Sequence, residues 1–381
     1  MVEGPGKADG ISRLVSVDIM KGLLVIGILF IHMLTFNADV REGGTMPTVL
    51  LMLYLGLMAF YIIAGYFYKP ERTFRENMRR VLMLALALAL TSLALPVIMY
   101  IWLTIFGQGP ELSDLWDSIL RAFWMYRLFE PMDGPLGYQM CYVNVINYYL
   151  WPMVAGLSVF FVLQKHVMDD WRKVAAIIMV SLMLQVVSAT VYVKLPFFLQ
   201  LCPIATAFIF LGASVSRYRI FERIEAFEWR SPRYWVPFIL SIVVGYLLCA
   251  FLPGGVKFDY MQFGDFGAWS VFPYFAEGTI ITLMYAYLTT MLSKIPLLSS
   301  LLALSGRHSL GIVLYHILFA KMLIAPFYDF TYGSWFPKEL DAMNLILIGL
   351  VTLVLCLVVS EYGNRLLHRT ISRCRTDHTT T

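Results

Sequence analysis

Long stretches of apolar residues, separated by short polar and charged segments, run through almost the whole chain. A helix that crosses a bilayer needs roughly 20 mostly apolar residues, and charge clusters and turns divide the chain into windows of about that length. The windows are residues 14–36, 47–68, 81–106, 139–163, 174–193, 196–215, 234–252, 269–292, 308–326 and 342–362. This pattern predicts an all-α, polytopic membrane protein of about ten transmembrane helices, with one domain over residues 1–381.

The composition supports lipid as the solvent of this chain. Apolar residues make up 59% of it and charged residues only 14%, whereas soluble proteins carry roughly 25% charged residues. A net charge of +4 gives no reason to expect a nucleic acid partner. The 5 cysteines are scattered along the chain and form neither a disulfide framework nor a close-spaced metal pattern, so we expect no metal site.

The distribution of Lys and Arg predicts the orientation in the membrane. With ten spans and a cytoplasmic N-terminus, 22 of the 29 basic residues fall in the inner segments 1–21, 69–80, 165–173, 216–233, 293–307 and 363–381. This bias follows the positive-inside rule, so both termini are predicted to be cytoplasmic, with 363–381 as a basic tail. The fifth and sixth windows are joined only by Lys194-Leu195, so a re-entrant pair in place of one of these spans stays open.

The longest predicted outer segment, residues 107–138, contains an amphipathic pattern. Its apolar residues recur at helical spacing, and they are Leu112, Leu115, Trp116, Ile119, Phe123 and Trp124. One interpretation is a helix that lies in the outer headgroup layer of the membrane. The alternative is that this helix roofs an outward-facing site and stacks its aromatic side chains on a sugar.

Ionisable residues inside a span are costly, so each is a candidate for function. Lys21 and His32 lie eleven residues apart in the first span, which puts them on one helical face and roughly 16 Å apart along the axis. Asp18 and Lys21 can neutralise each other as an i,i+3 pair. His32 can act as a base near physiological pH, or it can serve as a structural hydrogen-bonding group between helices.

The second inner segment contains Arg72, Arg75, Arg79 and Arg80. In a continuous helix, Arg72, Arg75 and Arg79 would line one face at the inner membrane surface. Arginine side chains bind phosphates well, as a nucleotide-bearing donor would require. The competing interpretation is ordinary positive-inside charge that contacts lipid headgroups.

Three further candidates lie late in the chain. His316 is a second histidine inside a predicted span, and Ser309 lies seven residues before it, on roughly the same helical face. Glu277 is the clear carboxylate at membrane depth, and it needs a partner, a proton or water. A protonated structural glutamate and a functional one are both consistent with this position.

Four motifs, in order, resemble those of the acyltransferase-3 family of integral membrane acyltransferases. Lys21 and His32, with ten residues between them, resemble the basic residue and histidine of its first span. The second span ends in Phe60-Tyr61-Ile62-Ile63-Ala64-Gly65-Tyr66, with Ala64 where the family usually has Ser. Arg72-x-x-Arg75, or equally Arg79-Arg80, is similar to its Arg-x-x-Arg. Gly306-Arg307-His308-Ser309, followed by Tyr315-His316, resembles its late motif, with Tyr315 displaced to directly precede the histidine.

The resemblance implies transfer of an acyl group, usually acetyl, from cytosolic acyl-CoA to a hydroxyl of a cell-surface glycan or its lipid-linked precursor. It implies His32 as general base or acyl carrier and Lys21 as a residue that touches the donor. The four arginines would bind the CoA phosphates, while Asp18, Glu277, Ser309 and His316 support the site. Acyl-CoA is then a co-substrate, with no bound cofactor, and the location is the plasma membrane.

Two other functions use the same sequence features. A glycan transporter or flippase would also use intramembrane His and Glu, although the chain has no repeated halves of the kind many transporters show. A glycan polymerase would also have a large outer loop, but it would not need a donor site at the cytosolic face. The sequence leaves the oligomeric state open, including a homo-oligomer.

The charge bias makes the topology testable. Reporter fusions after positions 75, 168, 225 and 375 should report the cytoplasm, and fusions after 42, 120, 260 and 335 should report the outside. The measurement is the paired activity of a reporter that works only inside and one that works only outside. A single inner-segment fusion that reports the outside would rule out the ten-span arrangement.

Overall fold

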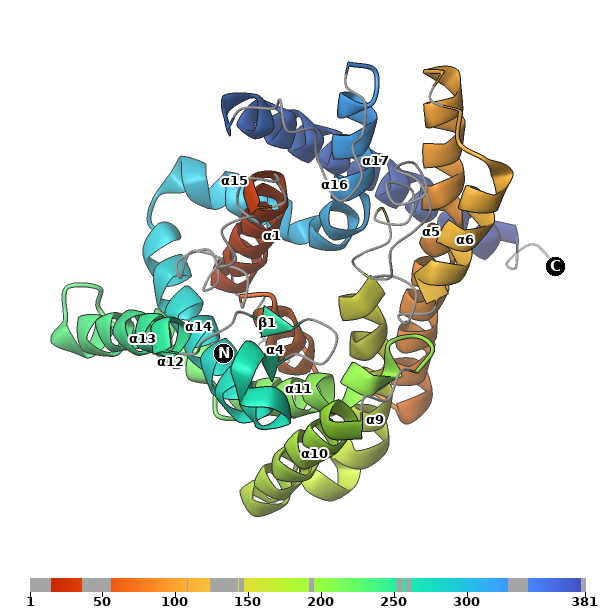
Figure 1. The fold of residues 1–381 in the computed structure, drawn as a ribbon. Helices are drawn as coiled ribbons and strands as arrows, with labels where there is room; N and C mark the ends of the chain where they lie inside the picture. The colour runs from red at the N-terminus through yellow and green to blue at the C-terminus, as the bar shows by residue number, and fades with distance from the viewer. Residues whose placement is uncertain are drawn as a thin grey trace.

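The computed structural model is a bundle of long helices, with α1 (Val15–Thr35) in its middle (Figure 1). It describes residues 15–35, 56–107, 109–123, 143, 147–191, 195–251, 256–257, 262–327 and 342–377. The other helices are α4 (Met58–Tyr66), α5 (Phe74–Ile105), α6 (Leu112–Phe123), α9 (Asn147–Val167), α10 (Trp171–Val191), η2 (Leu199–Leu201), α11 (Cys202–Arg217), α12 (Ile220–Glu225), α13 (Pro232–Phe251), η3 (Gly264–Ser270), α14 (Val271–Leu292), α15 (Pro296–Arg307), α16 (Ser309–Ile324) and α17 (Ala342–Asp377). Two two-residue strands, β1 (Val256–Lys257) and β2 (Gln262–Phe263), pair antiparallel.

The predicted fold class is confirmed: the protein is all-α and polytopic. Among the described residues, seven helices are long and apolar enough to cross a membrane, or eight if the bent pair α15–α16 forms one span. The predicted span 47–68 lies partly outside the described residues, and α14, which matches the predicted span 269–292, is not one of the seven. The count of ten therefore stays a prediction.

The interrupted span lies later in the chain than the sequence suggested. Because only Lys194-Leu195 joins the fifth and sixth predicted spans, the sequence left open that they include a re-entrant pair. In the structure, α10 and the segment Leu199–Arg217 are each long and apolar enough to cross the membrane alone. The predicted inner segment 293–307 contains the helix α15, Pro296–Arg307, and its place on the inner side stays a prediction. Pro296 suits the first turn of a helix, and α15 meets α16 at an angle of 82°.

Burial separates inner helices from outer ones. In α1 and α11, 67% of the span is buried inside the protein, compared with 28% in α5 and α13 and 22% in α17. The outer helices expose rows of apolar side chains, such as Leu86, Leu90 and Leu93 on α5. Faces this large and apolar are tolerated against lipid rather than water.

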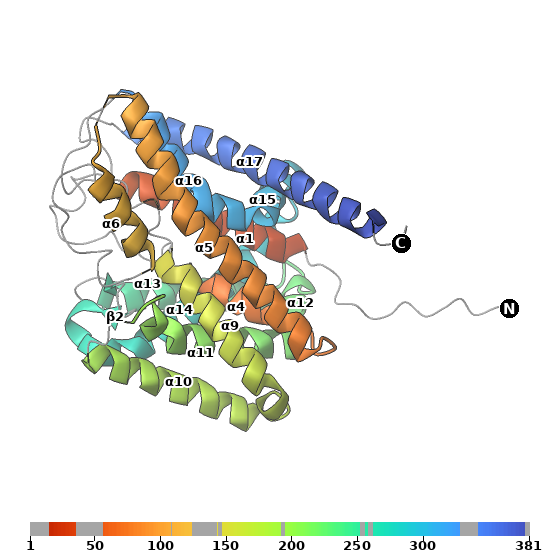
Figure 2. The same cartoon turned by 90° about the vertical axis from the view of Figure 1, so that its right-hand side faces the viewer.

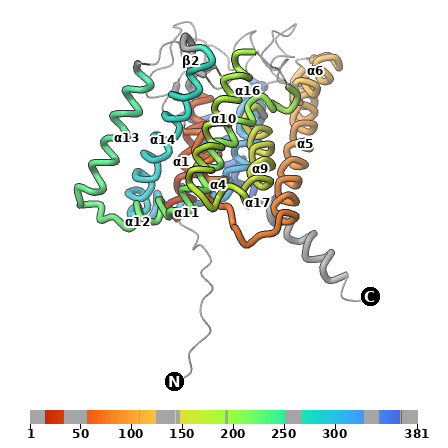
Figure 3. Tube along the Cα trace, turned by 90° about the horizontal axis from the view of Figure 1, so that it is seen from below, coloured from red at the N-terminus to blue at the C-terminus, as the bar shows by residue number. Residues whose placement is uncertain are grey.

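The two ends of the bundle differ. The start of α1 and the last turns of α17 lie at one end, and α6 lies at the other (Figure 2). The short helix α12 also lies opposite α6 and β2 (Figure 3). The inner segments that the sequence predicts between α9 and α10 and after α11 therefore share an end with the start of α1.

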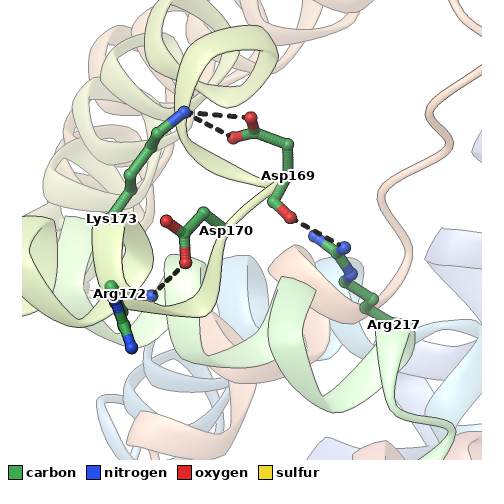
Figure 4. Close-up of polar contacts among 5 residues, drawn as sticks. All are labelled: Asp169, Asp170, Arg172, Lys173 and Arg217. Carbon is green, nitrogen blue, oxygen red and sulfur yellow. Dashed lines mark hydrogen bonds and ion pairs between the residues drawn. The ribbon is translucent and has the colours of Figure 1, made fainter.

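Polar contacts tie two of these basic segments together (Figure 4). Arg217 Nη2, at the end of α11, donates to the carbonyl oxygen of Asp169 at 3.0 Å. The Asp169 carboxylate accepts hydrogen bonds from Lys173, which lower the pKa of Asp169. The backbone N–H of Arg172 donates to Asp170 Oδ1 at 2.9 Å, which caps the start of α10. These contacts fix the turn between α9 and α10 against the end of α11.

The helix α6 falls within the segment for which the sequence predicts an amphipathic helix. It exposes Leu112, Trp116 and Leu120 along one side, while Asp117 and Arg121 form an ion pair of 2.7 Å. Residues 124–138, the rest of that segment, lie outside the described residues. A place for α6 in the outer headgroup layer stays a prediction.

A close helix crossing joins α1 to α15. A Cβ atom added to Gly22 would lie 1.9 Å from the carbonyl oxygen of Leu302, and one added to Gly306 would lie 1.8 Å from that of Asp18. Only glycine allows the two backbones to approach this closely, as is common where helices cross in membranes. This crossing fixes the position of α15 along α1.

A second crossing of the same kind joins α4 to α11. An added Cβ would lie 2.0 Å from the Ile209 carbonyl oxygen at Gly65 and 1.9 Å from the Ile62 carbonyl oxygen at Gly212. Each glycine meets the backbone of the other helix, where no side chain can move aside. The pair fixes α4 against α11 on the side opposite Phe60, Ile63 and Ala64, which line the cavity described below.

The first crossing predicts a contrast between two glycines of α1. Gly22→Ala should destabilise the protein by at least the roughly 1–3 kcal/mol typical of overpacking. Gly27→Ala is the matched control, because nothing lies within 4 Å of its added Cβ and alanine favours a helix. Thermal unfolding in detergent should show a lower Tm for the first variant and an equal or higher Tm for the second. Equal Tm values would show that the crossing does not constrain α1.

Candidate functional site

Two histidines from distant parts of the chain meet inside the bundle. His32 Nδ1, near the end of α1, lies 2.8 Å from His316 Nε2 on α16. The two ring planes are nearly parallel, inclined by 6°, and the centroids are 5.1 Å apart, which fits rings joined edge to edge by this hydrogen bond. His32 is 4% exposed and His316 is 1% exposed. The two intramembrane histidines that the sequence singled out separately therefore form one buried pair.

The hydrogen bonds of His316 assign the protons of this pair. His316 Nδ1 lies 3.0 Å from the carbonyl oxygen of Ile312 and 2.9 Å from that of Val313. Carbonyl oxygens only accept, so Nδ1 carries a proton, and Nε2 of the neutral ring then carries the lone pair. His32 Nδ1 must therefore donate to His316 Nε2, which leaves the lone pair of His32 on its own Nε2.

This arrangement prepares His32 to accept a proton. A general base works best when a second group fixes its tautomer and ring orientation, as the third member of a catalytic triad does. Here His316 takes that position, and the helix carbonyls of Ile312 and Val313 fix His316 in turn. When His32 Nε2 takes up a proton, the positive charge can be shared across the 2.8 Å hydrogen bond with His316.

His32 borders an apolar cavity of about 260 Å³ between α1, α4, α5, α9 and α16. Its volume lies just below the roughly 300–1,000 Å³ of most ligand pockets. Most of its walls are aliphatic or aromatic, and Ser309 adds a hydroxyl. The lining residues are Ile28, His32, Leu57, Phe60, Ile63, Ala64, Leu84, Tyr148, Tyr149, Leu150, Met153, Ser309, Leu310 and Val313.

A tyrosine pair supports one wall of this cavity. Tyr61 and Tyr149 stack with ring centroids 4.4 Å apart. The Tyr61 hydroxyl donates to the Tyr149 carbonyl oxygen at 2.8 Å, and the Tyr149 hydroxyl donates to the Leu57 carbonyl oxygen at 2.9 Å. These bonds hold α4 and α9 at a fixed separation. The sequence analysis named Tyr61 only as part of the aromatic motif of the second span, and it did not name Tyr149.

Arginines gather in a groove of about 460 Å³ at the start of α5, lined by Arg72, Glu76, Arg79, Arg80 and Met83. Partial burial and the positive charge of Arg80 lower the pKa of Arg72, so the groove concentrates like charges that an anion would neutralise. Arg75, which the sequence placed on the same face, does not line the groove.

The groove and the cavity are neighbours along α5. Arg80 lines the groove and Leu84 lines the cavity. They are an i,i+4 pair, so the two side chains lie on one side of the helix and roughly 6 Å apart along its axis. A long molecule with an anionic end in the groove therefore needs to extend by one helical turn to enter the cavity.

Lys21 and Asp18 lie away from the histidine pair. Lys21 Nζ is 2.7 Å from Asp18 Oδ1 and 5.5 Å from the centre of the Phe67 ring. Lys21 does not line the cavity, and the eleven-residue spacing puts it roughly 16 Å from His32 along α1. Direct contact of Lys21 with the group that reacts at His32 is not supported by this distance.

Glu277 is fully buried but belongs to another part of the bundle. The Cys249 thiol of α13 donates to Glu277 Oε1 at 3.2 Å, and within the described ranges Glu277 Oε2 has no hydrogen-bond partner. Glu277 does not line the cavity. Among the described residues, no three His, Cys, Asp or Glu side chains are placed to hold a metal ion.

The sequence analysis passed over one buried charge. Lys321 is 0% exposed and lies on α16, five residues after His316. In the charge count it was one of the 7 basic residues outside the predicted inner segments, although the predicted span 308–326 includes it. The rule that an ionisable residue inside a span is a functional candidate would have selected it.

One of the comparisons with known proteins identifies the family of this chain. The sequence model of a family described as an acyltransferase domain, that of acyltransferase family 3, matches residues 14–361. The match includes α1, α16 and the arginine groove, and so every candidate residue discussed above. No curated protein and no solved structure matches the chain. Because the match covers nearly the whole sequence, this chain belongs to the acyltransferase-3 family and is a multi-pass membrane acyltransferase.

Proposed function

We propose that this membrane acyltransferase moves an acyl group, acetyl in the simplest case, from cytosolic acyl-CoA to a hydroxyl of a cell-surface glycan or its lipid-linked precursor at the plasma membrane. The observation that carries the proposal is the buried His32–His316 pair beside an apolar cavity, with an arginine groove one helical turn away. The pair supplies a base, the cavity suits an apolar group, and the groove suits phosphates.

The donor would bind from the inner end. Guanidinium groups of Arg72, Arg79 and Arg80 would hold the CoA phosphates, since arginine pairs with phosphate through two parallel hydrogen bonds. The thioester end would follow α5 past Leu84 into the cavity and approach His32. Lys21 lies too far from His32 to polarise the thioester carbonyl, so contact with the donor nearer the inner surface is its remaining role.

In direct transfer, His32 Nε2 removes the proton of the acceptor hydroxyl while the hydroxyl oxygen attacks the thioester carbonyl carbon. The C–S bond then breaks, and the CoA sulfur takes the proton from the His32 imidazolium. The products are an ester and CoA thiol. The same nitrogen could instead attack the thioester carbonyl carbon, so that the C–S bond breaks and CoA leaves as a thiolate while the acyl group stays on the His32 imidazole. The acceptor hydroxyl oxygen would then attack this acyl carbon, the C–N bond would break, and the hydroxyl proton would pass to the CoA thiolate, which gives the same products.

His316 would act as a positioning residue. Its contact with His32 keeps the His32 lone pair on Nε2, and it shares the positive charge that forms during transfer. Ser309 would provide a hydroxyl to a polar part of the donor, because it lines the cavity near the start of α16. Asp18 would hold Lys21, and Glu277 would support the bundle through Cys249.

The role of His32 can be tested with a substitution that keeps a hydrogen-bonding group but removes the base. His32→Gln should lower acyl transfer by roughly 10²–10⁴-fold, because an amide cannot take a proton at neutral pH. The measurement is transfer of label from acetyl-CoA into the glycan fraction of membranes that contain the protein. His166→Gln, at an exposed histidine, is the matched control and should stay active. An active His32→Gln protein with normal CoA binding would contradict the assignment.

The arginine groove predicts a contrast within one cluster. Arg79→Ala should weaken binding of CoA by about 10- to 100-fold, the effect of losing a charge-assisted contact of roughly 1.5–3 kcal/mol. Arg75→Ala is the matched control, because Arg75 lies outside the groove. Arg79→Lys should bind CoA more tightly than Arg79→Ala but less tightly than the wild type, because an ammonium group cannot make the two parallel hydrogen bonds of a guanidinium group. Titration calorimetry with CoA measures all three, and equal affinities for the two alanine variants would exclude the groove as the phosphate site.

A further inference from the structure

Three aromatic side chains from separate segments form a cluster, called the aromatic cluster below, at one end of the bundle. They are Phe123 at the end of α6, Trp151 of α9, and Phe197, which lies between α10 and α11. The ring centroid of Trp151 lies 6.4 Å from that of Phe123 and 5.0 Å from that of Phe197. The cluster is at the end where α6 lies, opposite the start of α1 (Figure 2), which the charge bias predicts to be the outer end.

The chain holds Phe197 in an unfavourable backbone conformation. Phe197 and Phe198 have φ angles of 55° and 56°, in the left-handed region, which costs free energy for a bulky residue and is tolerated only where the surroundings enforce it. Here the N–H of Phe197 donates to the Phe123 carbonyl oxygen at 2.9 Å, and the Phe198 side chain is fully buried. These contacts fix the segment while the Phe197 ring remains 40% exposed.

Trp151 has an indole N–H that no described residue accepts. Its side chain is 8% exposed, and within the described ranges Nε1 has no hydrogen-bond partner. A tryptophan that only anchors a protein at the membrane surface turns this N–H toward water or lipid headgroups. A buried N–H without an acceptor costs free energy, and an oxygen atom of a ligand would remove that cost. Phe197 is the most exposed ring in contact with the indole, so such a ligand would bind beside Phe197.

A sugar ring has the chemistry that matches this cluster. One face of a pyranose presents C–H groups, and the faces of aromatic rings attract C–H groups because they carry partial negative charge. The oxygen atoms of the sugar accept hydrogen bonds, which an indole N–H donates. An alkyl chain would match the rings but leave the N–H without an acceptor. A phosphate would need a cation, which the three aromatic side chains do not supply.

The aromatic cluster adjoins the cavity beside His32. Tyr148, which lines that cavity, precedes Trp151 by three residues on α9, so the two side chains lie on one side of the helix and roughly 4.5 Å apart along its axis. His32 is close to the end of α1 at Thr35, which is the end of the bundle that holds the cluster. A molecule bound at the cluster is therefore within reach of the cavity.

We propose that the aromatic cluster binds a sugar ring of the acceptor glycan, with Phe197 against the apolar face of the sugar and Trp151 Nε1 as a donor to one of its oxygen atoms. The acceptor then approaches His32 from the end of the bundle opposite to the arginine groove. This inference rests on the proposed function, and it adds the part of the site that selects the acceptor.

The test is label transfer from acetyl-CoA to the glycan fraction of cells that lack this protein, with the KM determined for each substrate. Phe197→Leu keeps an apolar side chain and the same backbone cost but removes the ring, and it should raise the KM for the glycan by about two- to ten-fold. Trp151→Phe keeps a ring but removes the N–H, and a similar rise is expected from the loss of one hydrogen bond. Both variants should keep the KM for acetyl-CoA.

The matched control is Phe227→Leu, which changes a phenylalanine of similar exposure, 37%, that closely follows α12 at the opposite end of the bundle (Figure 3). This variant should keep both KM values. Thermal unfolding of all three variants reports whether the bundle itself has weakened.

The donor measurements separate this inference from the proposed function. If the wild-type protein transfers label but Phe197→Leu and Trp151→Phe keep its KM for the glycan, the cluster is not the acceptor site and the proposed function stands. If the KM values for both substrates rise together and Tm falls, the cluster only supports the bundle, which also excludes sugar binding there. If the wild-type protein transfers no label from acetyl-CoA to the glycan, both proposals are wrong.

Discussion

The close crossing of α1 and α15 determines where the two histidines meet. Gly22 and Gly306 bring the two backbones into contact, and each glycine lies ten residues before the histidine of its own segment. The bend of 82° after α15 then directs α16 along α1, so that His316 arrives 2.8 Å from His32. A shift of one residue at the crossing would move one ring by about 1.5 Å along the axis, which would break a hydrogen bond of this length.

Two of the buried charged groups, Asp18 and Arg121, are neutralised by a partner in their own helix, and this separates them from the histidine pair. Asp18–Lys21 and Asp117–Arg121 are pairs within one turn of a single helix. Such pairs lower the cost of a charge in lipid without joining distant segments. The histidine pair joins two helices that are far apart in the sequence and borders a cavity, which is the arrangement a reactive site needs.

The sequence predicted the members of the site better than their contacts. His32 and His316 stand out because ionisable residues are rare inside spans, but their meeting depends on α15, where the charge pattern indicated only a loop. The predicted arginine face was right for Arg72 and Arg79 and wrong for Arg75, which does not line the groove. The capping box of Thr73 and Glu76 starts α5 at Phe74, so Arg72 precedes the helix, and helical spacing does not put its side chain on the same face as that of Arg75. The cavity could not be predicted from the sequence, because its lining residues are ordinary apolar residues that come from five different helices.

The neutral partner of His32 has an electrical consequence. A carboxylate in the place of His316 would put a permanent charge inside the membrane, whereas the carbonyl oxygens of Ile312 and Val313 hold a neutral ring with dipoles alone. A membrane voltage does work only on charge, about 2.3 kcal/mol per elementary charge for each 100 mV crossed. The resting pair carries no net charge, so the membrane voltage does no work on it. In the proposed mechanism only the short-lived imidazolium would be exposed to the voltage, and only over the fraction of the field that its depth in the bilayer spans.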